Sequence, residues 1–74
     1  MPVKKSTYTL AKLAGTIKKR RVQMDLSREE LADRAKVNYN TIIKLESGAN
    51  QNPTILTLIG IAGVFKMKIE DLLK

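Results

Sequence analysis

Most side chains between residues 39 and 44 can form hydrogen bonds, and in a helix they would point outward. These outward residues are Tyr39, Asn40, Thr41, Ile43 and Lys44. Asparagine can pair bidentately with adenine, and lysine can contact guanine or a phosphate. The set indicates recognition of nucleic-acid bases. Tyr39 and Ile43 keep a second interpretation, as side chains packed against the protein surface.

Other chemistry is restricted by what the sequence lacks. With no cysteine and no histidine, it has no disulfide, Cys/His zinc site or Cys/His nucleophile. Its carboxylates fall only at spacings typical of helix caps and salt bridges, so we expect no enzyme, no cofactor and no small-molecule ligand. No apolar stretch reaches the roughly 20 residues of a membrane span. We expect a cytoplasmic protein.

Positive charge is concentrated at the amino end. The 74 residues carry a formal net charge of +7. Residues 1–24 contain seven Lys and Arg and no acidic residue, whereas positive and negative charges nearly balance over the rest. This distribution favours a polyanionic partner such as double-stranded DNA, because neutralising phosphates releases condensed counterions. A solvated basic tail that aids solubility is the alternative.

Apolar spacing and capping residues predict five helices in one all-α domain. We expect residues 1–8 to form a flexible basic arm and residues 9–74 to form the domain. A first helix should run from Thr9, its N-cap, to Met24. Ser27 and Glu30 have the spacing of a capping box and predict the start of a second helix.

Three further helices follow from the same signals. Asn38 should cap a short helix from Tyr39 to Ser47 that stops at Gly48, before a polar loop over residues 48–52. Pro53 suits the first turn of a fourth helix, and Ile69, Leu72 and Leu73 predict a final short one.

The second and third helices satisfy the packing requirements of a DNA-reading pair. In a window that starts at Arg28, apolar residues fall where two crossing helices need them: Leu31, Ala35, Val37, Ile42 and Leu45. Ala32 is small enough to let the helices cross closely.

In these features the chain resembles the Cro/CI-type helix-turn-helix family (XRE family, lambda-repressor-like). The resemblance rests on an ordered set of segments that together span about residues 10–73: Leu26 to Ala32, Val37, Ile42, Leu45 to Gly48, Pro53, Ile61-Ala62 and Ile69 to Leu73. It implies a compact five-helix domain whose helix-turn-helix lies at helices 2 and 3.

The resemblance also implies roles for individual residues. Tyr39, Asn40, Thr41 and Lys44 would face the major groove. Arg28 would touch a phosphate and also steady the recognition residues. The remaining DNA-binding candidates are the cap and the loop that would follow the backbone: Asn38, Asn50, Gln51 and Asn52. Arg21 and Glu46 would form a partly buried ion pair, the alternative being two ordinary surface charges.

Several positions depart from the family pattern. Lys36 stands in the turn where glycine is usual, so either the lysine accepts about 1 kcal/mol of backbone strain or the turn has another shape. Asp25 and Lys66 replace C-terminal glycines in the same way. Lys68 stands where a capping Ser or Thr is common, so we expect a frayed last helix.

The fourth helix should be apolar on two faces. Beside its core stripe, Leu56, Gly60, Gly63 and Met67 follow one another at helical spacing. A helix with two apolar faces usually has two neighbours. The second neighbour is either the last helix or another copy of the chain, and we expect a homodimer through helices 4 and 5.

The function expected is sequence-specific DNA binding by a transcriptional regulator, a repressor that binds a pseudo-palindromic operator as a dimer. A phage-type repressor, an antitoxin-like autoregulator and a restriction-modification controller are not distinguished by these residues. The alternative from another class is an antitoxin-like or antirepressor module that uses the same fold to bind protein.

Overall fold

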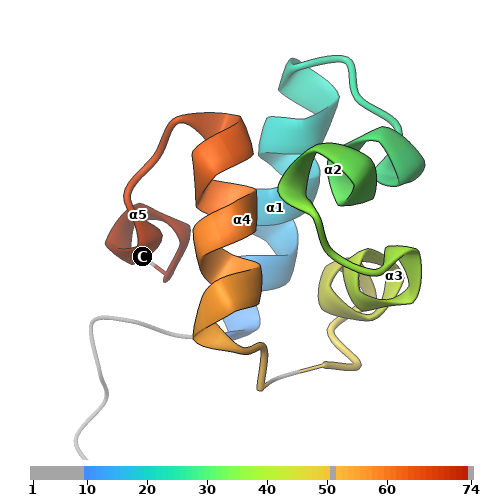
Figure 1. Ribbon diagram of the computed structural model, residues 1–74. Coiled ribbons are helices and arrows are strands. Elements are labelled where there is room, and N and C mark those ends of the chain that lie inside the picture. Colours follow the sequence, from blue (N-terminus) through green and yellow to red (C-terminus); the bar gives the residue numbers. More distant parts are fainter. Residues whose placement is uncertain (1–9, 51, 74) are drawn as a thin grey trace, which may run out of the picture.

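The structure, a computed structural model, describes residues 10–50 and 52–73, and within them the chain forms five helices and no strand (Figure 1). The helices are α1 (Leu10–Gln23), α2 (Arg28–Ala35), α3 (Tyr39–Ser47), α4 (Ile55–Phe65) and α5 (Ile69–Leu73). The all-α expectation is confirmed. The predicted arm over residues 1–8, the Thr9 cap and Gln51 lie outside the described residues.

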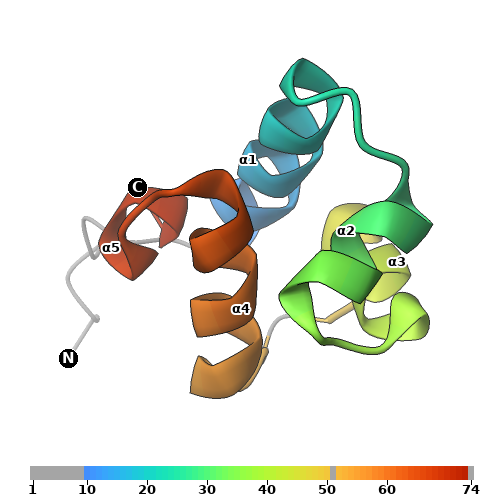
Figure 2. The ribbon, with the colours of Figure 1, turned by 45° about the horizontal axis from the view of Figure 1, so that its top comes forward.

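One apolar core joins the five helices. α4 crosses α1, with α2 and α3 on one side of this pair and α5 on the other (Figures 1 and 2). All five helices contribute buried side chains, among them Leu13, Ile17, Leu31, Ile42, Leu45, Ile61, Phe65 and Leu72. The helix-turn-helix therefore rests on a platform made by α1 and α4.

Three helices begin at side-chain caps. Ser27 Oγ accepts the Glu30 amide at 3.0 Å, and the Glu30 carboxylate accepts the Ser27 amide at 2.9 Å, which confirms the capping box. Asn38 caps α3 as predicted. The prediction for Pro53 was wrong: Thr54 is the N-cap of α4, and Pro53 precedes that cap instead of lying in the first turn.

Three helices end at a non-glycine residue with left-handed backbone. Within the described residues, Asp25, Lys36 and Lys66 have φ of 57°, 61° and 55°. The backbone after each helix closes on its last turn, as in the bond from the Val37 amide to the Ala32 carbonyl at 3.0 Å. The turn at Lys36 thus keeps the geometry typical of glycine, and the lysine bears the steric cost.

The last helix forms without a Ser or Thr cap. The Asp71 carboxylate accepts the Lys68 amide at 3.3 Å, and the Asp71 amide donates to the Lys68 carbonyl at 3.0 Å. Leu72 is fully buried against the core. Capping by Asp71 and burial of Leu72 account for an α5 helix where fraying was expected.

Candidate nucleic-acid interface

The burial pattern of α3 leaves one side of that helix for recognition. Ile42 and Leu45 are buried in the core, and the Asn38 carboxamide oxygen accepts the Asn40 amide at 2.8 Å. Asn40 and Lys44 are exposed, Thr41 is half-buried, and the Tyr39 side chain is 45% exposed. Ile43 is half-buried. The core contacts therefore fix which side chains α3 presents outward.

An open hollow of about 590 Å³ lies along this side of α3. Its lining combines the cap, the helix and the following loop: Asn38, Asn40, Thr41, Lys44, Ala49 and Asn50. Five of these six are residues that the sequence singled out. Tyr39, Arg28 and Asn52 do not line this hollow. The structure thus gathers most of the predicted base-reading residues beside the first loop residues.

Local hydrogen bonds shape the loop after α3. Gly48 ends the helix at a φ of 82°, which a residue with a Cβ adopts only with strain. The Asn50 amide donates to the Lys44 carbonyl at 3.0 Å, and the Asn50 side chain accepts the Asn52 amide at 2.9 Å. These bonds hold the loop against the end of α3.

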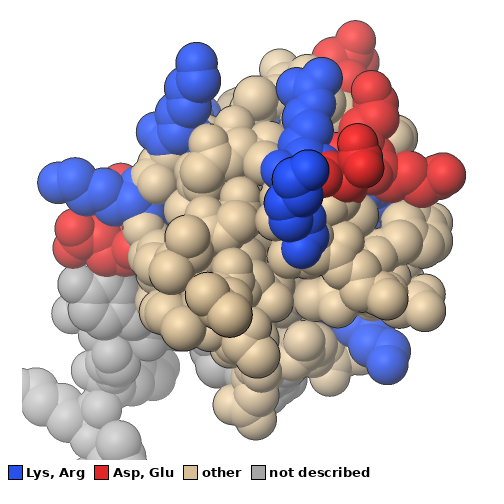
Figure 3. Space-filling view, in the orientation of Figure 1, with Lys and Arg blue, Asp and Glu red and all other residues tan. Residues whose placement is uncertain are grey.

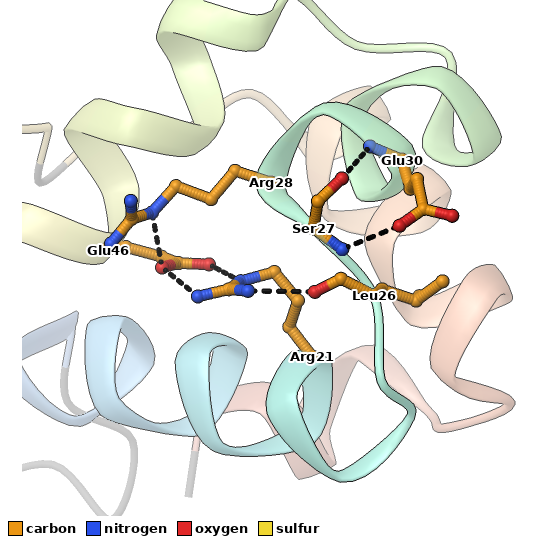
Figure 4. A network of polar contacts seen from close by, with 6 residues as sticks. All are labelled: Arg21, Leu26, Ser27, Arg28, Glu30 and Glu46. Atoms are coloured by element: carbon orange, nitrogen blue, oxygen red, sulfur yellow. Dashed lines mark hydrogen bonds and ion pairs between the residues drawn. The ribbon is translucent and has the colours of Figure 1, made fainter.

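An ion-pair network ties α1 and α2 to the end of α3 (Figure 4). Arg21 Nε lies 2.7 Å from Glu46 Oε2, and Arg21 also donates to the Leu26 carbonyl at 2.8 Å. The Glu46 side chain is 3% exposed and that of Arg21 is 11% exposed. The predicted partly buried pair is confirmed. Because a lone buried charge is costly, this pairing constrains where α3 sits on α1.

Arg28 contacts Glu46 of α3, a partner that the sequence did not identify. Its Nε lies 3.0 Å from Glu46 Oε1, so Glu46 is shared between two arginines (Figure 4). Arg28 and Glu46 are 18 residues apart, and no local spacing links them. The Arg28 side chain is 44% exposed, and through Glu46 it is joined to α3.

The capping box fixes the amino end of α2 beside this network. Hydrogen bonds from the Ser27 backbone and hydroxyl lower the pKa of Glu30 below its usual 4.5, with a smaller contribution from the charge of Arg34. Glu30 is therefore ionised at neutral pH, which suits its place near the positive end of the helix dipole.

Gly60 sets how closely α4 approaches α2. A Cβ at this position would run into the backbone carbonyl oxygen of Ala35. A Cβ at Gly63, about one turn later, would meet no other atom within 4 Å. The predicted stripe of Leu56, Gly60, Gly63 and Met67 is therefore not a single surface: Gly60 faces α2, and Met67 packs against the core.

Of the predicted stripe, Leu56 belongs to the exposed apolar side of α4, where it is joined by Ile55 and Ile59. Ile55, Leu56 and Ile59 are 60%, 76% and 50% exposed. α4 contains no charged residue, and the space-filling view shows a broad uncharged area over it (Figure 3).

The described residues offer neither a cluster of metal-binding side chains nor a membrane-spanning helix. No group of three or more Asp or Glu side chains lies close enough to hold a metal ion. None of the described helices is both long and apolar enough to cross a membrane.

The fold and this surface define a helix-turn-helix domain. A family model described as helix-turn-helix matches residues 17–72. An uncharacterized HTH-type transcriptional regulator of Archaeoglobus fulgidus is 43% identical over 56 residues, which is 76% of this chain and 78% of the relative. The chain belongs to the Cro/CI-type (XRE) helix-turn-helix family of DNA-binding transcriptional regulators.

Solved structures share the arrangement of helices. The DNA-binding domain of SinR from Bacillus subtilis matches with a TM-score of 0.81 and 27% identity, over 84% of this chain and 90% of that one. SinR in complex with DNA matches with a TM-score of 0.80, over 84% of this chain and 98% of that one. The restriction-modification controller C.AhdI from Aeromonas hydrophila has the same fold at 20% identity, with a TM-score of 0.78 over 86% and 96% of the two chains.

Proposed function

We propose that this protein reads a specific duplex sequence by placing α3 in the major groove. The observation that carries the proposal is the outward side of α3, where Asn40, Thr41 and Lys44 border one hollow while Ile42 and Leu45 hold the opposite side in the core. Amide, hydroxyl and ammonium groups can donate hydrogen bonds to acceptor atoms on base edges and to phosphate oxygens. Tyr39 adds a ring that can contact sugar or a thymine methyl.

Residues around α3 position the domain on the backbone. Arg28 at the start of α2 contacts one strand. Asn38, Asn50, Gln51 and Asn52 contact the other strand from the helix cap and the loop. Contacts of this kind set register and orientation and carry no sequence information of their own.

Two copies bind one operator through α4 and α5. The support is the exposed apolar side of α4 at Ile55, Leu56 and Ile59, since water-exposed aliphatic side chains gain free energy when covered. A two-fold dimer would read a pseudo-palindrome with half-sites about 34 Å apart. The proposed outcome is repression, through exclusion of other proteins from the occupied DNA.

Selection from randomised duplexes tests this proposal. The protein is bound to a random duplex library, and the retained DNA is sequenced after several rounds. We expect a pseudo-palindrome with two half-sites one helical turn apart. Equal retention of every sequence, or no binding even at low salt, would overturn the proposal and favour a protein-binding module. Fusion of the selected site to a reporter promoter then tests repression against activation.

A further inference from the structure

A second hollow lies on the other side of α3. It has a volume of about 290 Å³ and is lined by residues from three helices: Lys18 of α1, Arg28 of α2, and Ile43, Glu46 and Ser47 of α3. The first hollow is lined by Asn40, Thr41 and Lys44. With about 3.6 residues per turn, the two sets lie on opposite flanks of the outward side of α3.

The second hollow carries a net positive charge. Glu46 contributes one negative charge, and Arg21, which pairs with it from beneath, offsets that charge. Lys18 and Arg28 then leave two positive charges at the rim. Lys18 is exposed, and Arg28 bonds Glu46 through Nε alone. Within the described residues, the Lys18 ammonium and the two terminal nitrogens of Arg28 have no acceptor.

We infer that Lys18 and Arg28 together bind one phosphate of the DNA backbone in this hollow. The inference rests on the proposed function, in which α3 enters the major groove. A helix in that groove has a backbone strand on each side, so each flanking hollow faces one strand. The first hollow faces one strand with Lys44 and Asn50, and the second faces the other with Lys18 and Arg28.

Glu46 acts here as a positioning residue. Its carboxylate accepts a hydrogen bond from Arg28 Nε at 3.0 Å, and the two terminal nitrogens of that guanidinium take no part in this bond (Figure 4). Arg21 in turn holds Glu46, and both side chains are largely buried. The position of Arg28 at the proposed phosphate site is therefore set by the packing of α1 against α3. This phosphate site would extend the DNA contact to Lys18 of α1, and its affinity would not depend on base sequence.

The test uses Lys18→Ala with Lys19→Ala as its matched control. Lys19 has the same charge on the same helix, but it lies roughly 100° further round and does not line the hollow. Affinity for the selected duplex and for a scrambled duplex is measured by fluorescence anisotropy at several salt concentrations. Thermal unfolding confirms that both variants are folded.

We expect Lys18→Ala to lower the slope of log affinity against log salt by up to about 0.9, the value for one phosphate, because Arg28 still contacts that phosphate. The upper value corresponds to roughly an eightfold loss of affinity at 0.1 M salt relative to 1 M, equal for both duplexes. Lys19→Ala should change the slope far less. If the two variants had equal slopes while the unaltered protein kept its sequence preference, the proposed phosphate contact of Lys18 and Arg28 would be wrong and the proposed function would stand. Loss of all DNA binding by the unaltered protein would overturn both proposals.

Discussion

At the scale of single residues, strain is concentrated where helices end. Lys36 adopts a φ of 61° in the turn that sets the angle between α2 and α3. A left-handed backbone costs a residue with a Cβ about 1–2 kcal/mol, and glycine avoids this cost. The strained position lies at the joint of the DNA-reading unit, so the turn keeps its shape at the expense of stability.

Replacing Lys36 measures this strain. Lys36→Gly should have a free energy of unfolding about 1 kcal/mol higher than Lys36→Ala, because both variants lose the charge and only glycine relieves the φ of 61°. Urea unfolding followed by circular dichroism gives the two values. If the alanine variant were as stable as the glycine variant, the turn would carry no such strain.

The residues of the site differ in how well the sequence predicts them. The pairing of Arg21 with Glu46 was implied by the family resemblance, and it was supported by the place of Arg21 on the apolar stripe of α1, where a lone charge is costly. The bond from Arg28 to the same carboxylate could not, since it depends on how α2 crosses α3. The hollow beside Lys18 was missed for the same reason: its lining comes from three helices.

At the scale of elements, helix starts follow from local sequence and helix contacts do not. The capping box at Ser27 and the cap at Asn38 are short-range patterns that need only a few neighbouring residues. Pro53 misled because proline is equally compatible with the residues just before a cap, and Thr54 supplied the better cap. Gly60 was placed on the wrong surface because both faces of α4 are apolar.

Two glycines of α4 give opposite predictions. Gly60→Ala should destabilise the protein, by about 1–3 kcal/mol, because its Cβ would collide with the Ala35 carbonyl and push α4 from α2. Gly63→Ala should stabilise it by about 0.5–1 kcal/mol, because the space is open and alanine favours a helix. Thermal unfolding of both variants checks this, and a gain in stability for Gly60→Ala would contradict the close approach.

The capping box of α2 gives a pH dependence with a definite sign. The pKa of Glu30 is lowered below 4.5 in the folded protein by the Ser27 hydrogen bonds. Ionised Glu30 therefore stabilises the fold at pH values above its ordinary pKa, and this contribution is lost as the pH falls through the lowered value.

Comparison with Glu30→Gln isolates that contribution. The stability difference between the unaltered protein and this variant should be constant near neutral pH and should shrink as the pH falls below about 4.5, since glutamine does not titrate. Melting temperatures over a pH series provide the measurement. A difference that stayed the same down to acid pH would exclude the lowered pKa.

At the scale of the whole molecule, α4 serves two surfaces. One side forms the core, and the other exposes Ile55, Leu56 and Ile59. The loop that borders the recognition helix leads directly into this exposed side. A second copy bound there would fix the distance between two recognition helices, which is what a pseudo-palindromic operator requires.

A charge on this side should separate the copies. Leu56→Lys is expected to weaken the dimer roughly a hundredfold, because two mostly exposed leucines lose the burial that association would give them. Val22→Lys is the control, since Val22 is 60% exposed and lies on another helix, α1. Sedimentation velocity distinguishes the species. If the unaltered protein were monomeric both with and without its operator, the proposed dimer would be wrong.

The central claim is that Asn40 reads bases from the outward side of α3. The most direct test compares the unaltered protein with Asn40→Ala on the selected duplex and on its single-base variants, with Asn52→Ala as a backbone-contact control. We predict that Asn40→Ala loses about 1–3 kcal/mol of binding free energy and its preference at one or two positions of each half-site. Asn52→Ala should weaken binding to every duplex equally. An Asn40→Ala variant that kept the full base preference would contradict the claim.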